Sequence, residues 1–116
     1  MHQYEKFSAR RKAIFEFYLE NIQAVNNWDL VDLSAPNIIG RFIFQEGESS
    51  PSLITLLIKL TRSVNLWERR ISIVSTYYFI KNNRFDETIH ISEVLLNDKH
   101  DLIHKAVGWM LREVGK

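Results

Sequence analysis

Trp28 and Asp32 are the residues whose types and spacing best support chemistry. They lie four positions apart, so their side chains share one face of a helical turn, which Asn26 or Asn27 can cap. A carboxylate beside an indole can stabilise the positive charge that develops on a sugar when its glycosidic bond breaks. The ring face of a tryptophan also attracts cations, such as an alkylated purine. The alternative is structural, with Trp28 in the core and Asp29 and Asp32 as a cap and a solvated charge.

A second candidate is Arg70, because it interrupts an apolar row. On a helix this row consists of Trp67, Arg70, Val74 and Tyr77. An arginine is unusual there unless its guanidinium reaches a phosphate or a carboxylate, and Asp32 is one candidate partner. The alternative is an arginine whose stem packs at a seam between helices while its head reaches water. Arg69 falls in a polar row, so we expect it to be solvated.

A third candidate is the stripe of Lys105, Gly108, Trp109 and Arg112 near the end of the chain. Glycine inside a helix costs about 1 kcal/mol relative to alanine, so Gly108 suggests that another backbone or a ligand comes close. A tryptophan between two cations suits a phosphate backbone with a sugar or base, which makes Lys105 and Arg112 candidate DNA-binding residues. The alternative is a tightly packed helix pair in which Trp109 fills the space over Gly108.

The elements that must position these residues are helices. Glycine and proline are scarce, and Ser34-Ala35-Pro36 and Ser50-Pro51 each suggest a cap followed by proline in a first turn. Apolar residues recur at three- and four-residue steps. The pattern predicts about seven helical segments, at roughly 8–24, 27–33, 35–45, 51–63, 66–82, 86–96 and 101–114.

Short connections make neighbouring helices antiparallel. Antiparallel pairs at this spacing predict an all-α fold, a HEAT-like α-solenoid of antiparallel helix pairs, with a closed bundle as the alternative. The last helix carries an apolar row of its own, formed by Ile103, Val107, Met110 and Val114. In a solenoid a further helix pair would cover that row. We therefore expect residues 1–116 to form a single HEAT-like-repeat domain that is a fragment of a longer protein.

Composition excludes several classes of site. The 116 residues contain no cysteine, which excludes disulfides, a thiol nucleophile and thiolate metal ligands and favours a cytoplasmic location. No run of about 18 apolar residues suggests a membrane span. His100 and His104 have the spacing of helical metal ligands, but no third ligand is evident, so we expect no metal. The net charge is only +1, so charge alone does not indicate or exclude nucleic acid.

Three segments resemble the bacterial DNA alkylation repair enzymes, the AlkD-like glycosylases built from HEAT-like helix pairs. They are NNWDLVDLSAPNIIG, LWERRISIVSTYYFI and HDLIHKAVGWMLREVGK, in the family's order and roughly at its spacing. The similarity runs from about Phe15 to Lys116. Family members are considerably longer than this chain, with helices on both sides of the matching region.

The resemblance implies a role for each matching position. Asp32 corresponds to the family's catalytic carboxylate, and Trp28 and Trp109 correspond to tryptophans that contact the lesion. Arg70 corresponds to an arginine that contacts DNA near the site.

The activity implied is hydrolysis of the N-glycosidic bond of cationic N3- or N7-alkylated purines in double-stranded DNA. In such a reaction Asp32 stabilises the oxocarbenium-like sugar or positions water. The resemblance implies neither metal nor cofactor, no membrane partner, and work at the bacterial nucleoid. The alternative function is a non-catalytic HEAT-like module that binds DNA or protein.

Overall fold

The computed structural model describes residues 3–116, and every regular element in that range is helical. The α-helices are α1 (Gln3–Glu20), α2 (Trp28–Ala35), α3 (Arg41–Glu46), α4 (Ser52–Leu60), α5 (Leu66–Val74), α6 (Thr76–Lys81), α7 (Asp86–Val94) and α8 (Asp101–Val114). Three shorter turns complete them: the 3-10 turns η1 (Ile22–Ala24) and η3 (Leu95–Asn97), and the π-helical turn η2 (Pro36–Gly40). The prediction of an all-α fold is confirmed.

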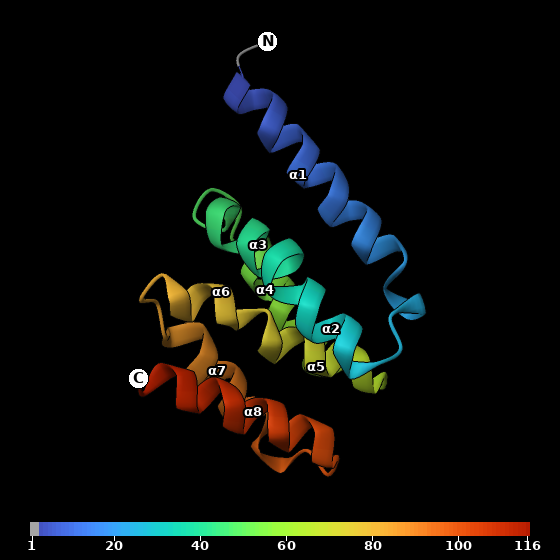
Figure 1. The fold of residues 1–116 in the computed structure, drawn as a ribbon, viewed down its shortest axis with the longest axis vertical. Helices are drawn as coiled ribbons and strands as arrows, with labels where there is room; N and C mark the ends of the chain where they lie inside the picture. The colour runs from blue at the N-terminus through green and yellow to red at the C-terminus, as the bar shows by residue number, and fades with distance from the viewer. Residues whose placement is uncertain (1–2) are drawn as a thin grey trace.

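The helices form an open stack. Helix α5 packs extensively against both α2 and α8, and these three helices form one layer of the molecule. Helices α1 and α8 lie at opposite ends of the stack, which measures 48 × 31 × 23 Å (Figure 1). This open order is that of an α-helical solenoid rather than of a closed bundle, and it places one face of α2, α5 and α8 in a continuous row.

Residues 28–46 form one helical run, although the sequence predicted a new helix beginning after Ser34. Pro36 lies inside this run and has no N–H to donate to the carbonyl of Asp32. The chain accommodates the proline through η2, where the N–H of Arg41 donates to the Pro36 carbonyl five residues earlier. The predicted cap at Ser34 is therefore wrong, because tertiary packing carries the helix past the proline.

The π-helical turn packs directly on the junction between α5 and α6. The sequence predicted an unbroken helix over 66–82, but the helix is interrupted at Ser75. A Cβ atom on Gly40 would lie closer than 3.0 Å to the Ser75 carbonyl oxygen, so only glycine permits this approach. The irregular turns of two neighbouring helical runs therefore face each other.

Helix α1 is attached to the run that follows it by two aromatic contacts. The rings of Phe15 and Phe42 stack with their centroids 4.3 Å apart. The hydroxyl groups of Tyr18 and Ser34 lie 2.8 Å apart, within hydrogen-bonding distance. Burial raises the pKa of Tyr18 above its ordinary value of 10.0, and the hydrogen bond with Ser34 opposes that shift. These contacts fix the position of α1 relative to α2 and α3.

The core lies between the paired helices. Its fully buried side chains include Val31, Ile39, Ile43, Leu57, Ile71, Ile73, Val74, Phe79, Ile91, Ile103 and Met110. Helices α5 and α7 pack on α8 and bury Ile103 and Met110, so the expectation that the row on the last helix lacks cover is wrong. The exposed apolar side chains at this end include Leu96 and Leu111 instead. No helix within residues 3–116 is long and apolar enough to cross a bilayer.

Candidate functional site

The first turn of α2 presents Trp28 to solvent. The side chain of Asn27 caps the helix by accepting a hydrogen bond from the N–H of Leu30 at 2.8 Å, as the sequence predicted. Trp28 follows directly and is 52% exposed, so the alternative that it belongs to the core is wrong. Asp32 lies one turn later on the same face. An exposed indole therefore lies next to a carboxylate at the surface of α2.

Asp32 is paired with Arg70 of α5. The Arg70 Nε donates to Asp32 Oδ1 at 3.1 Å and Nη2 donates to Oδ2 at 3.0 Å, which is a two-pronged arginine–carboxylate pair. The remaining Arg70 nitrogen, Nη1, donates to the carbonyl oxygen of Leu102 in α8 at 2.5 Å. One guanidinium thus joins α2, α5 and α8.

Burial differs between the two partners. The Arg70 side chain is only 7% exposed, whereas that of Asp32 is 19% exposed. The expectation that Arg70 reaches a carboxylate is confirmed, and the alternatives of a guanidinium reaching water and of a fully solvated Asp32 are wrong. Asp32 is held in a fixed orientation while part of its surface remains accessible.

The sequence predicted that Arg69, next to Arg70 in the chain, is solvated, and this prediction is wrong. The Nε of Arg69 donates to Asp98 Oδ2 at 2.7 Å and its Nη1 to the carbonyl oxygen of Ser63 at 3.0 Å. The two side chains of that ion pair are 19% and 10% exposed. The polar row on the helix therefore faces the loop before α5 and the loop before α8, which only the tertiary structure brings together.

Trp109 lies farther from the pair than Trp28. It is partly buried and packs on Tyr77 of α6, with ring centroids 5.7 Å apart. Trp109 follows Leu102 by seven residues on α8, a rise of about 10 Å. Trp109 is therefore about two turns further along α8 than the backbone oxygen that Arg70 engages, whereas Trp28 lies one turn from Asp32 on α2.

The rest of the α8 stripe is open to solvent. Lys105 is exposed and forms an ion pair with Asp101 at 3.1 Å. Arg112 is exposed, and its Nη1 would be 3.6 Å from a Cβ atom on Gly108, the only close neighbour within the described chain. Gly108 is therefore not covered by a packed helix, and the alternative of a tight helix pair at this point is wrong.

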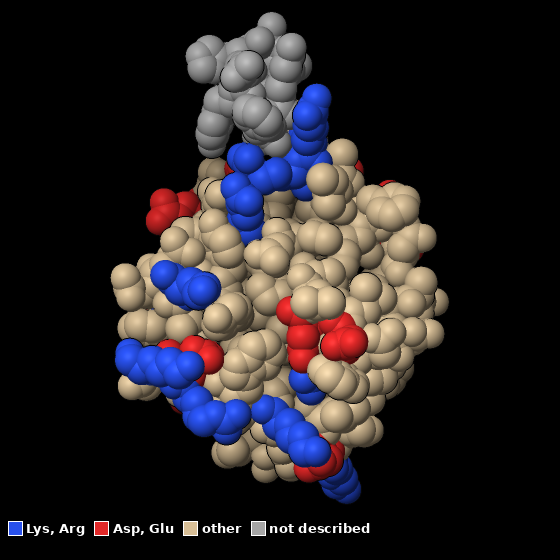
Figure 2. Space-filling model, viewed as in Figure 1, with Lys and Arg blue, Asp and Glu red and all other residues tan. Residues whose placement is uncertain are grey.

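Charge is distributed unevenly over this face. Figure 2 shows acidic side chains gathered over α2 near the centre of the view and basic side chains along α8 at its lower edge. The exposed basic residues of α8 and the chain end are Lys105, Arg112 and Lys116. The face thus combines a central acidic spot, suited to a cation, with a basic edge suited to phosphates.

The chain matches one family model, described as DNA alkylation repair enzyme, over residues 1–116. It belongs to the DNA alkylation repair enzyme family. No curated protein and no solved structure matches it significantly. The family match agrees with the resemblance found in the three sequence segments and supports a role in DNA repair.

In this family member the structure brings together some of the expected site residues and separates others. Asp32 and Arg70 are in direct contact, and Trp28 lies one turn from Asp32. Trp109, Lys105 and Arg112 share α8, which touches the pair through the backbone of Leu102. Among the described side chains of residues 9–116 no group of three or more His, Cys, Asp or Glu could hold a metal ion. His100 instead caps α8, accepting from the N–H of Leu102 at 3.2 Å.

Two features of the site were missed in the sequence. The Leu102 carbonyl leaves no trace in sequence because any residue supplies a backbone oxygen. Tyr77 was named only as a member of the apolar row around Arg70, but it is partly exposed and contacts Trp109, with the Lys81 ammonium 5.2 Å from its ring centroid. Its place seven residues after Arg70, on the same row of the helix, was the available signal.

Proposed function

We propose that this chain carries the catalytic residues of a DNA glycosylase that hydrolyses the N-glycosidic bond of cationic N3- or N7-alkylated purines. The observation that carries the proposal is a partly accessible carboxylate, Asp32, held by Arg70 beside the exposed indole of Trp28, in a member of a DNA alkylation repair family. Asp32 stabilises the oxocarbenium-like sugar or positions the attacking water. Trp28 and Trp109 contact the lesion.

Electrostatics support this assignment. An alkylated purine carries a positive charge and already has a weakened glycosidic bond, so a fixed negative group near the sugar lowers the barrier without deep enclosure of the base. The acidic spot over α2 is flanked by the basic edge of α8, as Figure 2 shows. In the proposed complex Lys105 and Arg112 hold phosphates while the cationic nucleotide faces Asp32.

Arg70 has a double role in this proposal. A guanidinium has five N–H donors, and Asp32 and Leu102 engage three of them. In the proposed complex the two that remain contact a DNA phosphate beside the lesion. The main contribution of Arg70 is to orient Asp32, because its side chain is almost completely buried.

The test is release of a methylated purine from a DNA duplex that contains N3- or N7-methylated bases. Asp32→Asn keeps the shape of the side chain and removes its charge, and we expect it to reduce the single-turnover rate by about 10²- to 10³-fold, the usual effect of removing one group that stabilises a transition state. Asp29→Asn is the matched control, because Asp29 lies on the same turn, is exposed and has the same charge. Equal background rates for the wild type and both variants would refute the glycosylase.

One observation favours a second function, a non-catalytic DNA-binding module. Both oxygens of Asp32 already accept hydrogen bonds from Arg70, as they would if the pair only held α2 and α5 together. That function predicts salt-dependent DNA binding, weakened by substitution of Lys105 or Arg112, with no base release at any lesion. Base release above background by the wild-type protein rules it out.

A further inference from the structure

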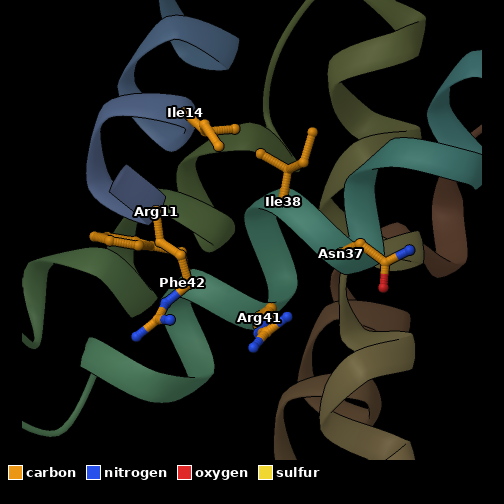
Figure 3. A pocket seen from close by; sticks show the side chains of 6 residues that line it. All are labelled: Arg11, Ile14, Asn37, Ile38, Arg41 and Phe42. Atoms are coloured by element: carbon orange, nitrogen blue, oxygen red, sulfur yellow. The ribbon is translucent and has the colours of Figure 1, made fainter. Parts of the chain in front are cut away.

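A hollow lies between α1 and the π-helical turn, apart from the Asp32–Arg70 pair. It encloses about 460 Å³ of space, part of it open to solvent, and is lined by Arg11, Ile14, Asn37, Ile38, Arg41 and Phe42. Figure 3 shows the guanidinium groups of Arg11 and Arg41 on the same side of the hollow, with Ile14 and Ile38 facing each other across its other end. The lining thus has a cationic side and an apolar side.

The cationic side lacks a carboxylate. Among the side chains that the structure describes, residues 9–116, no acidic residue lines the hollow, and neither guanidinium forms an ion pair. The Arg11 Nε is buried, and it finds no hydrogen-bond acceptor among the described residues. A buried donor without a partner is rare in folded proteins and suggests an acceptor supplied from outside.

The fold holds this arrangement in place. Stacking of Phe15 on Phe42 fixes α1 one turn beyond Arg11, and the hydrogen bond between Tyr18 and Ser34 holds the turn after that. The π-helical turn widens the helical run at Pro36–Gly40, and π turns of this kind occur frequently at functional sites. Asn37 and the arginine that follows the turn thereby reach the same hollow.

We propose that the Arg11–Asn37–Arg41 hollow binds a backbone phosphate of DNA, with the apolar side chains bordering the adjoining sugar. The two guanidiniums match the acceptor oxygens of a phosphate. This inference takes its DNA partner from the proposed function. Arg41 follows Asp32 by nine residues, a rise of about 14 Å along the same run, or about four base-pair steps of duplex at 3.4 Å each. Basic side chains beside α1 lie on the same face as the acidic spot over α2 (Figure 2).

The test compares two double variants with the same change in charge. Arg11→Gln with Arg41→Gln removes the hollow's cations, and Arg10→Gln with Arg62→Gln removes two exposed arginines outside it. Binding to a labelled DNA duplex is measured by fluorescence anisotropy between about 50 and 200 mM salt. One lost phosphate contact lowers the slope of log K against log salt by about 0.9, which corresponds to about eightfold weaker binding at 0.1 M. Thermal melting followed by circular dichroism verifies that both variants are folded.

We expect the weaker binding and the smaller slope only in the hollow variant. Equal effects in both double variants, or no DNA binding by the wild type, would overturn the proposal. A second titration, with inorganic phosphate alone, separates the two sources of the anion: if only phosphate binding is lost while DNA binding is unchanged, the hollow takes a free anion and the backbone contact is wrong. Base release is measured in parallel. If the wild-type protein releases no base but only the hollow variant binds DNA more weakly, the glycosylase proposal is wrong and the phosphate contact is still supported.

Discussion

Replacing Arg70 with methionine removes all three hydrogen bonds of its guanidinium and leaves the Asp32 carboxylate without a partner. Removing one member of a buried ion pair costs about 3–5 kcal/mol. Because Asp32 keeps 19% of its side chain in contact with water, we expect the lower end, about 3 kcal/mol. Asp32→Asn leaves Arg70 with only part of its hydrogen-bond partners. It should lower the free energy of unfolding by about 2 kcal/mol, the usual contribution of a hydrogen bond to a charged group.

The double variant isolates the interaction between the two side chains. When Asp32→Asn and Arg70→Met are combined, neither charge remains buried and unpaired, so we expect a total cost of about 3 kcal/mol instead of the sum of about 5. The coupling energy is then about 2 kcal/mol. Urea denaturation followed by tryptophan fluorescence and by circular dichroism measures each free energy of unfolding.

The neighbouring arginine provides the control. Arg69 pairs with Asp98 and not with Asp32, although it is the adjacent residue. Arg69→Met combined with Asp32→Asn should therefore be additive within about 0.5 kcal/mol. Additivity of the Arg70 and Asp32 substitutions would refute the pairing, and strong coupling of Arg69 with Asp32 would show that the two arginines exchange their partners.

Two further predictions concern packing. Gly40→Ala should lower the free energy of unfolding by up to about 3 kcal/mol, because its methyl group would overlap the Ser75 backbone. Gly108→Ala is the control: its methyl group would meet only the Arg112 side chain, so the free energy of unfolding should stay equal or rise. A similar loss of stability in both variants would contradict the close approach of Gly40 to Ser75. Trp28→Ala should change stability by less than about 0.5 kcal/mol because the indole is mostly exposed. Trp109→Ala should be clearly destabilising in the same urea titration because its ring packs on Tyr77, and the opposite order would contradict the observed exposure of the two rings.

Much of this molecule follows from short-range patterns. The spacing of Trp28 and Asp32 placed both on one face of a helix, and Asn27 caps that helix as its residue type predicts. The bounds of α8 match the prediction of 101–114 because a strongly periodic apolar row marks it. These features depend on residues within one or two turns of each other, so the sequence alone determines them.

The partners of charged side chains required the tertiary structure. Arg69 and Arg70 are adjacent and chemically identical, yet one pairs with Asp98 and the other with Asp32. Periodicity identified Arg70 as out of place and suggested Asp32, but it assigned Arg69 to solvent, because the position of the loop before α8 depends on how the helices stack.

The same limit applies to the backbone. Proline is tolerated in the first turn of a helix but not in its interior, and Pro36 therefore predicted the start of a new helix. The structure keeps the helix and absorbs the proline in a π-helical turn, since Gly40 allows that turn to approach the interruption at Ser75. Local sequence thus determined the helical class of the fold, the capped turn at Asn27 and the shared face of Trp28 and Asp32. Contacts between residues far apart in the chain decided which charges meet, and a hollow between α1 and the π-helical turn could not be foreseen from either segment alone.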